Sequence, residues 1–165
     1  MTNTWGEVVA ASTYAAAAAG GTALAVVDWR TKRLPNKIVF PLYGVGVVGL
    51  GAASWLEHRG GALLVALISM AAIFAVLYLL CMFGSLGFGD VKLGGLLGLY
   101  LGWLGLPVLL VGLVFGTLLG ALTGAGMVTV RAVRGESLRS LRKVPIAFGT
   151  FLIIGATLAA ALHVA

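Results

Sequence analysis

Long apolar runs are the feature that most constrains this chain. A helix needs about 20 apolar residues to cross the hydrocarbon core of a bilayer. We predict six membrane-spanning helices, at Val8–Val27, Ile38–Leu56, Ala62–Phe83, Leu86–Leu106, Pro107–Val130 and Val144–Leu162. Charged residues make up only 10% of the chain, whereas a soluble domain carries about 25%. The expected fold class is therefore all-α, a polytopic membrane protein in which residues 1–165 form a single transmembrane domain.

The positive charges indicate how these helices cross the membrane. Ten of the eleven Lys and Arg residues follow the first, third and fifth predicted helices: Arg30, Lys32, Arg33, Lys37, Lys92, Arg131, Arg134, Arg139, Arg142 and Lys143. With alternating helices these ten share one side, and only Arg59 lies on the other. Cytoplasmic loops carry an excess of Lys and Arg, so we expect that side to be cytoplasmic and both termini to lie outside. Despite the net charge of +6, this distribution favours anionic lipids as partners of the basic loops and argues against nucleic acid.

Glycine recurs every four residues in the fourth and fifth predicted helices. The positions are Gly94, Gly98 and Gly102, then Gly112, Gly116, Gly120 and Gly124. Residues four apart share one face of a helix, and small residues let helices approach closely within a membrane. We therefore expect tight packing that holds the fourth helix, and Asp90 with it, in place.

Two isolated aspartates are the candidate functional residues. Asp28 directly follows the first apolar run, and Asp90 lies about one turn into the fourth. A carboxylate at mid-membrane costs roughly 2.5–3.5 kcal/mol on insertion scales, so such a residue suggests a function. The predicted topology places both aspartates at the same face and at similar depth, where they could form a pair.

Three other roles remain open for these aspartates. Each could pair with a nearby cation, Asp28 with Arg30, Lys32 or Arg33, and Asp90 with Lys92. Both could serve a small proton-coupled transporter, because intramembrane acids also mark proton pathways. Finally, the chain could be a purely structural membrane subunit.

The residues around the aspartates carry a resemblance to a known family. Asp28 with Arg33-Leu34-Pro35-Asn36, and the segment Gly87-Phe88-Gly89-Asp90-Val91-Lys92-Leu93, resemble the two aspartate signatures of type IV prepilin peptidases. These enzymes are the bacterial members of the GxGD intramembrane aspartic proteases. The segment Pro145-Ile146-Ala147-Phe148-Gly149 is similar to the family's third, noncatalytic motif. The three motifs occur in order over nearly the whole chain.

The resemblance implies that Asp28 and Asp90 are catalytic, supported by Arg33, Pro35, Asn36, Gly87, Gly89 and Lys92. It further implies a substrate that is a prepilin or pseudopilin with a basic leader, as in type IV pilus or type II secretion systems. The expected location is the bacterial inner (cytoplasmic) membrane, with the active site at the cytoplasmic face. Whether the chain forms a homo-oligomer is left open.

Many members of this family carry paired CxxC motifs associated with methylation of the new pilin N-terminus. Cys81 is the one cysteine in this sequence, so the chain resembles a short form. We therefore expect no methyltransferase activity and no cofactor, neither S-adenosylmethionine nor zinc or any other metal. The expected mechanism needs only the two carboxylates, which share one proton and activate a water molecule between them.

Overall fold

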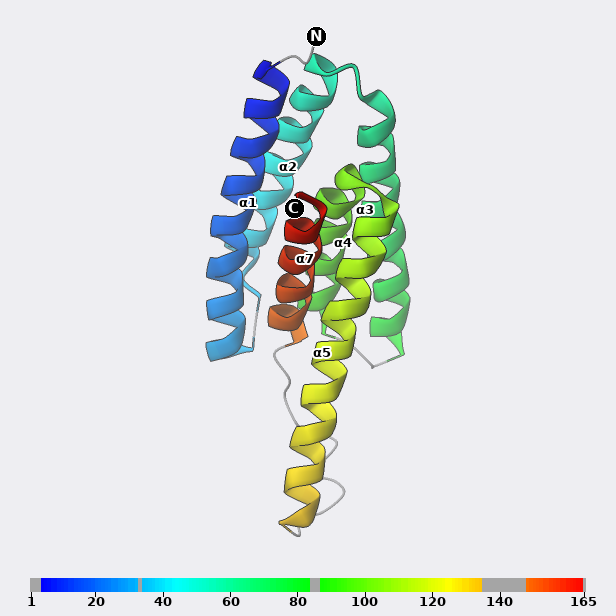
Figure 1. Ribbon diagram of the computed structural model, residues 1–165. Coiled ribbons are helices and arrows are strands. Elements are labelled where there is room, and N and C mark those ends of the chain that lie inside the picture. The colour runs from blue at the N-terminus through cyan, green and yellow to red at the C-terminus, as the bar shows by residue number, and fades with distance from the viewer. Residues whose placement is uncertain (1–3, 33, 84–86, 135–147, 165) are drawn as a thin grey trace.

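The computed structural model describes residues 4–32, 34–83, 87–134 and 148–164, and over these ranges its regular structure is helical throughout. The helices are α1 (Thr4–Thr31), α2 (Asn36–Leu56), α3 (Gly60–Met82), α4 (Phe88–Leu104), α5 (Leu106–Val133) and α7 (Phe148–Val164). Successive helices alternate in direction, so α1 ends and α4 begins at the same end of the bundle (Figure 1). We call this the aspartate end, because it carries Asp28 and Asp90. The all-α prediction is confirmed for the described residues.

Four of these helices, α1, α2, α3 and α5, are long and apolar enough to cross a membrane. The other two, α4 and α7, have 17 residues each. At 1.5 Å per residue a helix of that length extends about 26 Å, slightly less than a hydrocarbon core of about 30 Å. The structure therefore supports a polytopic membrane protein, while the count of six spans and their orientation stay predictions.

The boundaries of the helices differ from those predicted. Helix α1 is longer than the apolar run Val8–Val27, because polar residues at both ends continue the helix. Helix α4 is shorter than the predicted Leu86–Leu106, and it ends at Leu104. Gly105 follows with a φ of 133°, which a side chain would strain. The predicted C-terminal end of this helix was wrong because this glycine turns the chain into α5.

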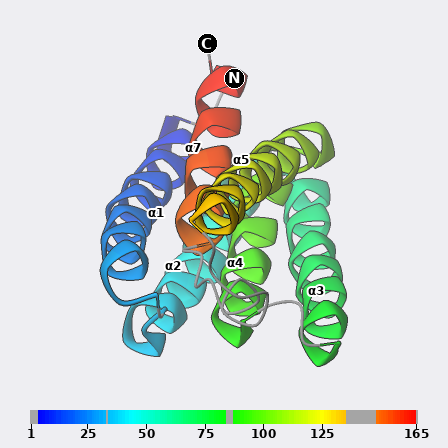
Figure 2. The same ribbon diagram turned by 90° about the horizontal axis from the view of Figure 1, so that it is seen from below.

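Helix α4 lies at the centre of the bundle, among α2, α3, α5 and α7 (Figure 2). Its residues Leu93 and Leu99 are almost completely buried. Helix α3 lies at the edge and exposes large apolar side chains, among them Leu64, Ile68 and Leu79. In water such a surface would be unfavourable, whereas lipid tails solvate it.

The predicted close packing through glycine is confirmed for both helices. A Cβ atom on Gly98 would lie 2.8 Å from the carbonyl oxygen of Ser69 in α3. A Cβ atom on Gly116 would lie 2.8 Å from the Cα atom of Leu152 in α7. Gly155, which lies in α7 and faces the glycines of α5, has no place in the predicted glycine pattern. The glycines thus allow the backbone of α3 to contact that of α4, and the backbone of α5 to contact that of α7.

We predict that Gly155→Ala destabilises the protein. The new Cβ atom would lie 2.5 Å from the carbonyl oxygen of Gly112 and 2.7 Å from the Cα atom of Gly116, and backbone atoms cannot rotate away. Overpacking of this kind costs about 1–3 kcal/mol. The measurement is the thermal unfolding temperature of the detergent-solubilised protein. Gly44→Ala is the control, because nothing lies within 4 Å of its Cβ position. Equal unfolding temperatures for the two variants would contradict the described packing.

Candidate active site

Asp28 lies in the last turn of α1 and is only 4% exposed. Its Oδ2 atom accepts a hydrogen bond of 2.9 Å from the backbone N–H of Thr150 and one of 3.1 Å from the Thr150 hydroxyl. Thr150 is the third residue of α7, where backbone N–H groups have no partner within the helix. The Asp28 carboxylate therefore caps α7, and the positive end of that helix dipole stabilises its charge.

Asp90 lies in the first turn of α4 and is partly exposed. Gly87 precedes the helix in an extended conformation, with φ −78° and ψ 144°, and its carbonyl accepts a hydrogen bond of 3.0 Å from the Asp90 N–H. A Cβ atom on Gly87 would lie 3.4 Å from Asp90 Oδ2. Asp90 is therefore also at the N-terminal, positive end of a helix, and the glycine leaves one side of its carboxylate open.

The segments that carry the two aspartates meet in the structure. The side chain of Leu34, between α1 and α2, lies against the glycines beside each of them. Its Cδ1 atom would be 3.3 Å from a Cβ on Gly89 and 3.2 Å from a Cβ on Gly149. A Cβ on Gly149 would also lie 3.0 Å from Asp28 Oδ2. Leu34 belongs to the first aspartate signature, and it contacts Gly89 of the second signature and Gly149 at the end of the third motif. The three motifs are therefore in contact.

The other predicted site residues that the structure describes lie near the aspartates. Pro35 immediately precedes α2, and Asn36 begins it. The Lys92 ammonium donates a hydrogen bond of 2.9 Å to Asn36 Oδ1, and it lies 4.6 Å from the ring centre of Phe88. This hydrogen bond therefore connects the N-terminal part of α4 to the start of α2. Gly87 and Gly89 flank Asp90 as described above. Arg33 and residues 145–147 of the third motif lie outside the described residues.

Among the described residues neither aspartate forms a salt bridge with a cation; Arg33, one candidate partner of Asp28, lies outside them. Within the described ranges the one salt bridge joins Arg59 to Glu57 at 3.4 Å. That pair follows α2, at the end of the bundle opposite the aspartates (Figure 1). Lys92, the proposed partner of Asp90, donates to Asn36 instead. Both aspartates lie instead at helix N-termini, which favours a functional role.

Two contacts of this site were missed from the sequence. Thr150 was overlooked, although threonine is common at helix starts and this one directly follows the third motif. The Tyr43 hydroxyl donates a hydrogen bond of 2.6 Å to the carbonyl oxygen of Lys92, which holds α4 against α2. No local sequence pattern predicts this hydrogen bond, because its two partners are 49 residues apart in the chain.

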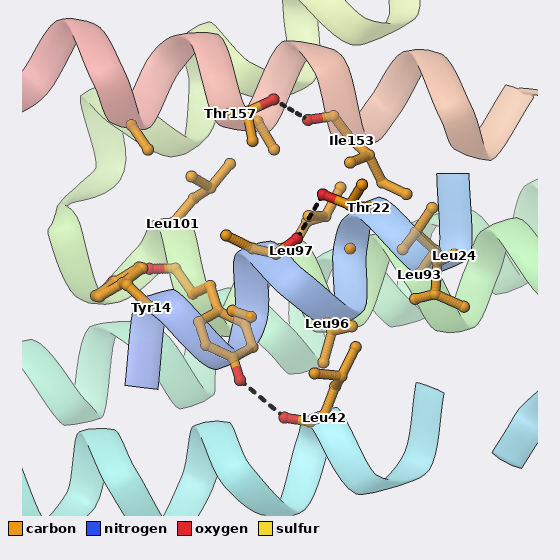
Figure 3. Close-up of a pocket in the computed structure, with 16 residues that line it drawn as sticks. Tyr14, Thr22, Leu24, Leu42, Leu93, Leu96, Leu97, Leu101, Ile153 and Thr157 are labelled. Atoms are coloured by element: carbon orange, nitrogen blue, oxygen red, sulfur yellow. Dashed lines mark hydrogen bonds between the residues drawn. The ribbon is translucent and has the colours of Figure 1, made fainter. Parts of the chain in front are cut away.

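A cavity of about 260 Å³ lies next to the site, among α1, α2, α4 and α7 (Figure 3). Leu24, Leu93 and Ile153 line it on the side of the aspartates. The lining of the cavity is almost entirely apolar, because most of it consists of Leu and Ala side chains. The hydroxyls of Thr22 and Thr157 donate to carbonyl oxygens of their own helices. It provides room for apolar groups and no second set of catalytic side chains.

Metal binding finds no support in this arrangement. Among the residues that the structure describes, no three His, Cys, Asp or Glu side chains gather into a possible metal site. The two aspartates supply carboxylate oxygens alone. The expected absence of metal and cofactor remains a prediction.

The fold and the site together define a class: a helical membrane protein with two aspartates at one end of its bundle. The family described as "Type IV leader peptidase family" matches residues 15–130, a span that contains both Asp28 and Asp90. The chain therefore belongs to the type IV leader peptidase family, and the resemblance seen in its motifs is confirmed.

Curated relatives agree with this assignment. The chain is 32% identical to a prepilin leader peptidase/N-methyltransferase of Escherichia coli over 80% of its own length and 55% of the relative. It is 31% identical to the protein of the same name from Dickeya chrysanthemi over 86% of its own length and 47% of the relative. The chain thus spans about half the length of these relatives. No solved structure matches it.

We predict that cysteines at positions 34 and 89 form a disulfide in the variant Leu34→Cys/Gly89→Cys/Cys81→Ser. A Cβ atom at position 89 would lie 3.3 Å from the Cβ atom of Leu34, close to the spacing in disulfides of about 3.5–4.5 Å. The measurement is loss of labelling by a polyethylene-glycol maleimide after mild oxidation, reversed by reductant.

The control for this cross-link is Leu34→Cys/Gly61→Cys/Cys81→Ser, because Gly61 lies at the start of α3, at the opposite end of the bundle, with open space around it. Both thiols of the control should remain labelled after oxidation. Equal labelling of the two variants would contradict the contact that brings the aspartate segments together.

Proposed function

We propose that this chain is an aspartic endopeptidase that removes the basic leader of a type IV prepilin or pseudopilin, with Asp28 and Asp90 as its catalytic pair. One observation carries the proposal: Asp28 of α1 and Asp90 of α4 lie at one end of an apolar bundle, on segments that both contact Leu34. Membership of the leader peptidase family supports the reaction. The relatives are named prepilin leader peptidase/N-methyltransferase, which supports the substrate class.

The proposed mechanism uses the two carboxylates in alternating roles. In this mechanism the pair shares one proton, so that one carboxylate acts as the base and the other as the acid. The ionised carboxylate accepts a proton from a water molecule, whose oxygen attacks the scissile carbonyl carbon. The neutral carboxylate donates its proton to the carbonyl oxygen. Transfer of a proton to the amide nitrogen then breaks the C–N bond and releases a new carboxyl group and a new amine.

The surroundings of the pair suit this chemistry. The N-termini of α7 and α4 provide fixed positive potential where negative charge develops during attack. Oδ1 of Asp28 accepts no hydrogen bond from the described residues, while Thr150 donates to Oδ2. We infer that Oδ1 is the atom that contacts the attacking water. Gly87 leaves room for an extended substrate backbone beside Asp90, whereas the space beside Gly89 is occupied by Leu34.

A proton-coupled transporter is not favoured. Both aspartates lie at one end of the bundle and therefore do not form a path across it. The adjacent cavity is lined mainly by Leu and Ala side chains, and its lining contains no acidic or basic side chain. The family match is to peptidases.

We further propose that the aspartate end faces the cytoplasm of a bacterial inner membrane, with six spans and both termini outside. The excess of Lys and Arg in the loops at that end supports this orientation. Anionic lipid headgroups would neutralise those loops. A substrate whose apolar helix lies in the bilayer would then present its leader at the level of the dyad.

The orientation predicts different access to engineered cysteines in a Cys81→Ser background. Arg30→Cys at the end of α1 should react with a membrane-impermeant maleimide only after cells are lysed. Gly61→Cys at the start of α3 has open space around it and should react in intact bacterial cells whose outer membrane has been permeabilised. The reverse pattern would invert the topology and place the dyad outside.

We predict that Asp28→Asn and Asp90→Asn each abolish cleavage. Loss of one member of a catalytic unit typically costs roughly 10⁴-fold or more, because the remaining group cannot complete the proton transfers. The measurement is the size shift of an epitope-tagged prepilin that is co-expressed with each variant at matched enzyme levels.

The matched control is Glu57→Gln, which also neutralises one carboxylate but lies at the opposite end of the bundle. It should process the prepilin as the wild type does. Near-normal processing by Asp28→Asn or Asp90→Asn would rule out the dyad.

A further inference from the structure

Thr150 makes two hydrogen bonds to the same carboxylate oxygen. Its backbone N–H lies 2.9 Å and its hydroxyl 3.1 Å from Asp28 Oδ2. The hydroxyl also lies 3.2 Å from the carbonyl oxygen of Ala25, one turn earlier in α1. One threonine at the start of α7 thus contacts both the backbone of α1 and the carboxylate near its end.

Asp28 needs such a partner because its own helix does not stabilise its charge. It lies in the last turn of α1, where the helix dipole is negative and repels a carboxylate. Within the described residues no cation forms a salt bridge with it. The donors on Thr150 therefore both compensate the charge and select the rotamer of Asp28.

We propose that Thr150 is a positioning residue for catalysis, which holds Oδ2 of Asp28 so that Oδ1 is directed to the reacting water. The inference rests on the proposed function, in which Asp28 is catalytic. The polar atoms of Thr150 are directed at Asp28 Oδ2 and at the carbonyl oxygen of Ala25, so it acts through Asp28. Without the hydrogen bonds from Thr150, the Asp28 carboxylate would also adopt rotamers in which Oδ1 does not reach the water. A misplacement of about 1 Å can reduce the rate roughly 100-fold.

The experiment compares Thr150→Val, Thr150→Ala and Thr150→Ser as purified proteins, with a purified prepilin as substrate. Valine keeps the shape and the N–H donor but removes the hydroxyl, alanine removes the hydroxyl with less bulk, and serine retains it. We expect kcat to fall about tenfold for Val and Ala, since a hydrogen bond to a charged group is lost. KM should be unchanged, and Ser should restore the wild-type kcat.

Thr123→Val is the control, because the Thr123 hydroxyl donates only within its own helix, to the carbonyl oxygen of Leu119 at 2.8 Å. It should leave kcat unchanged. The concentration of folded enzyme is measured by fluorescence-detected gel filtration, so that kcat is expressed per folded molecule.

The outcomes separate the inference from the function on which it rests. Wild-type kcat per folded molecule in both Val and Ala, or a Ser variant as impaired as they are, would overturn the role of Thr150. In that case loss of cleavage in Asp28→Asn would leave the proposed function intact. Retained cleavage in Asp28→Asn would instead overturn the dyad itself.

Discussion

Close approach of helix backbones at glycine is the constraint on which the rest of this structure depends. In lipid, apolar side chains gain little from burial against one another, so helices associate where their backbones come close enough for dense packing. Gly98 brings α4 against α3, and Gly116 and Gly155 bring α5 against α7. The first pair of helices carries Asp90, and the second carries Thr150. The positions of the functional groups therefore follow from contacts made by residues without side chains.

Charge within an apolar bundle is the second constraint. A carboxylate needs either a cation or oriented dipoles to remain ionised away from water. This chain uses helix N-termini for both aspartates, α7 for Asp28 and α4 for Asp90. Dipoles of the backbone stabilise negative charge without a paired cation. That arrangement suits acid–base chemistry better than a salt bridge would.

The site was predictable where its residues are close in sequence. The segment from Gly87 to Asp90 predicted a carboxylate at the start of a helix with room beside it. In the structure Asp90 lies in the first turn of α4, and Gly87 leaves one side of its carboxylate open. The role of Lys92 was not predictable, because the choice between Asp90 and Asn36 depends on how α4 lies against α2. The C-terminal end of α4 was predicted wrongly because Gly105 adopts a positive φ and ends the helix. The apolar run continues past this glycine, so hydrophobicity alone does not mark the end.

The sequence alone determined that this protein is helical, that it belongs in a membrane, and that Asp28 and Asp90 lie at the same end. These properties follow from the length and order of apolar runs, since lipid requires each spanning segment to satisfy its own backbone hydrogen bonds. Only the tertiary structure decided that Leu34 meets Gly89 and Gly149, and that Thr150 binds Asp28 across 122 residues of chain. Such contacts depend on the rotation and depth of each helix in the bundle, which side-chain packing sets and hydrophobicity does not.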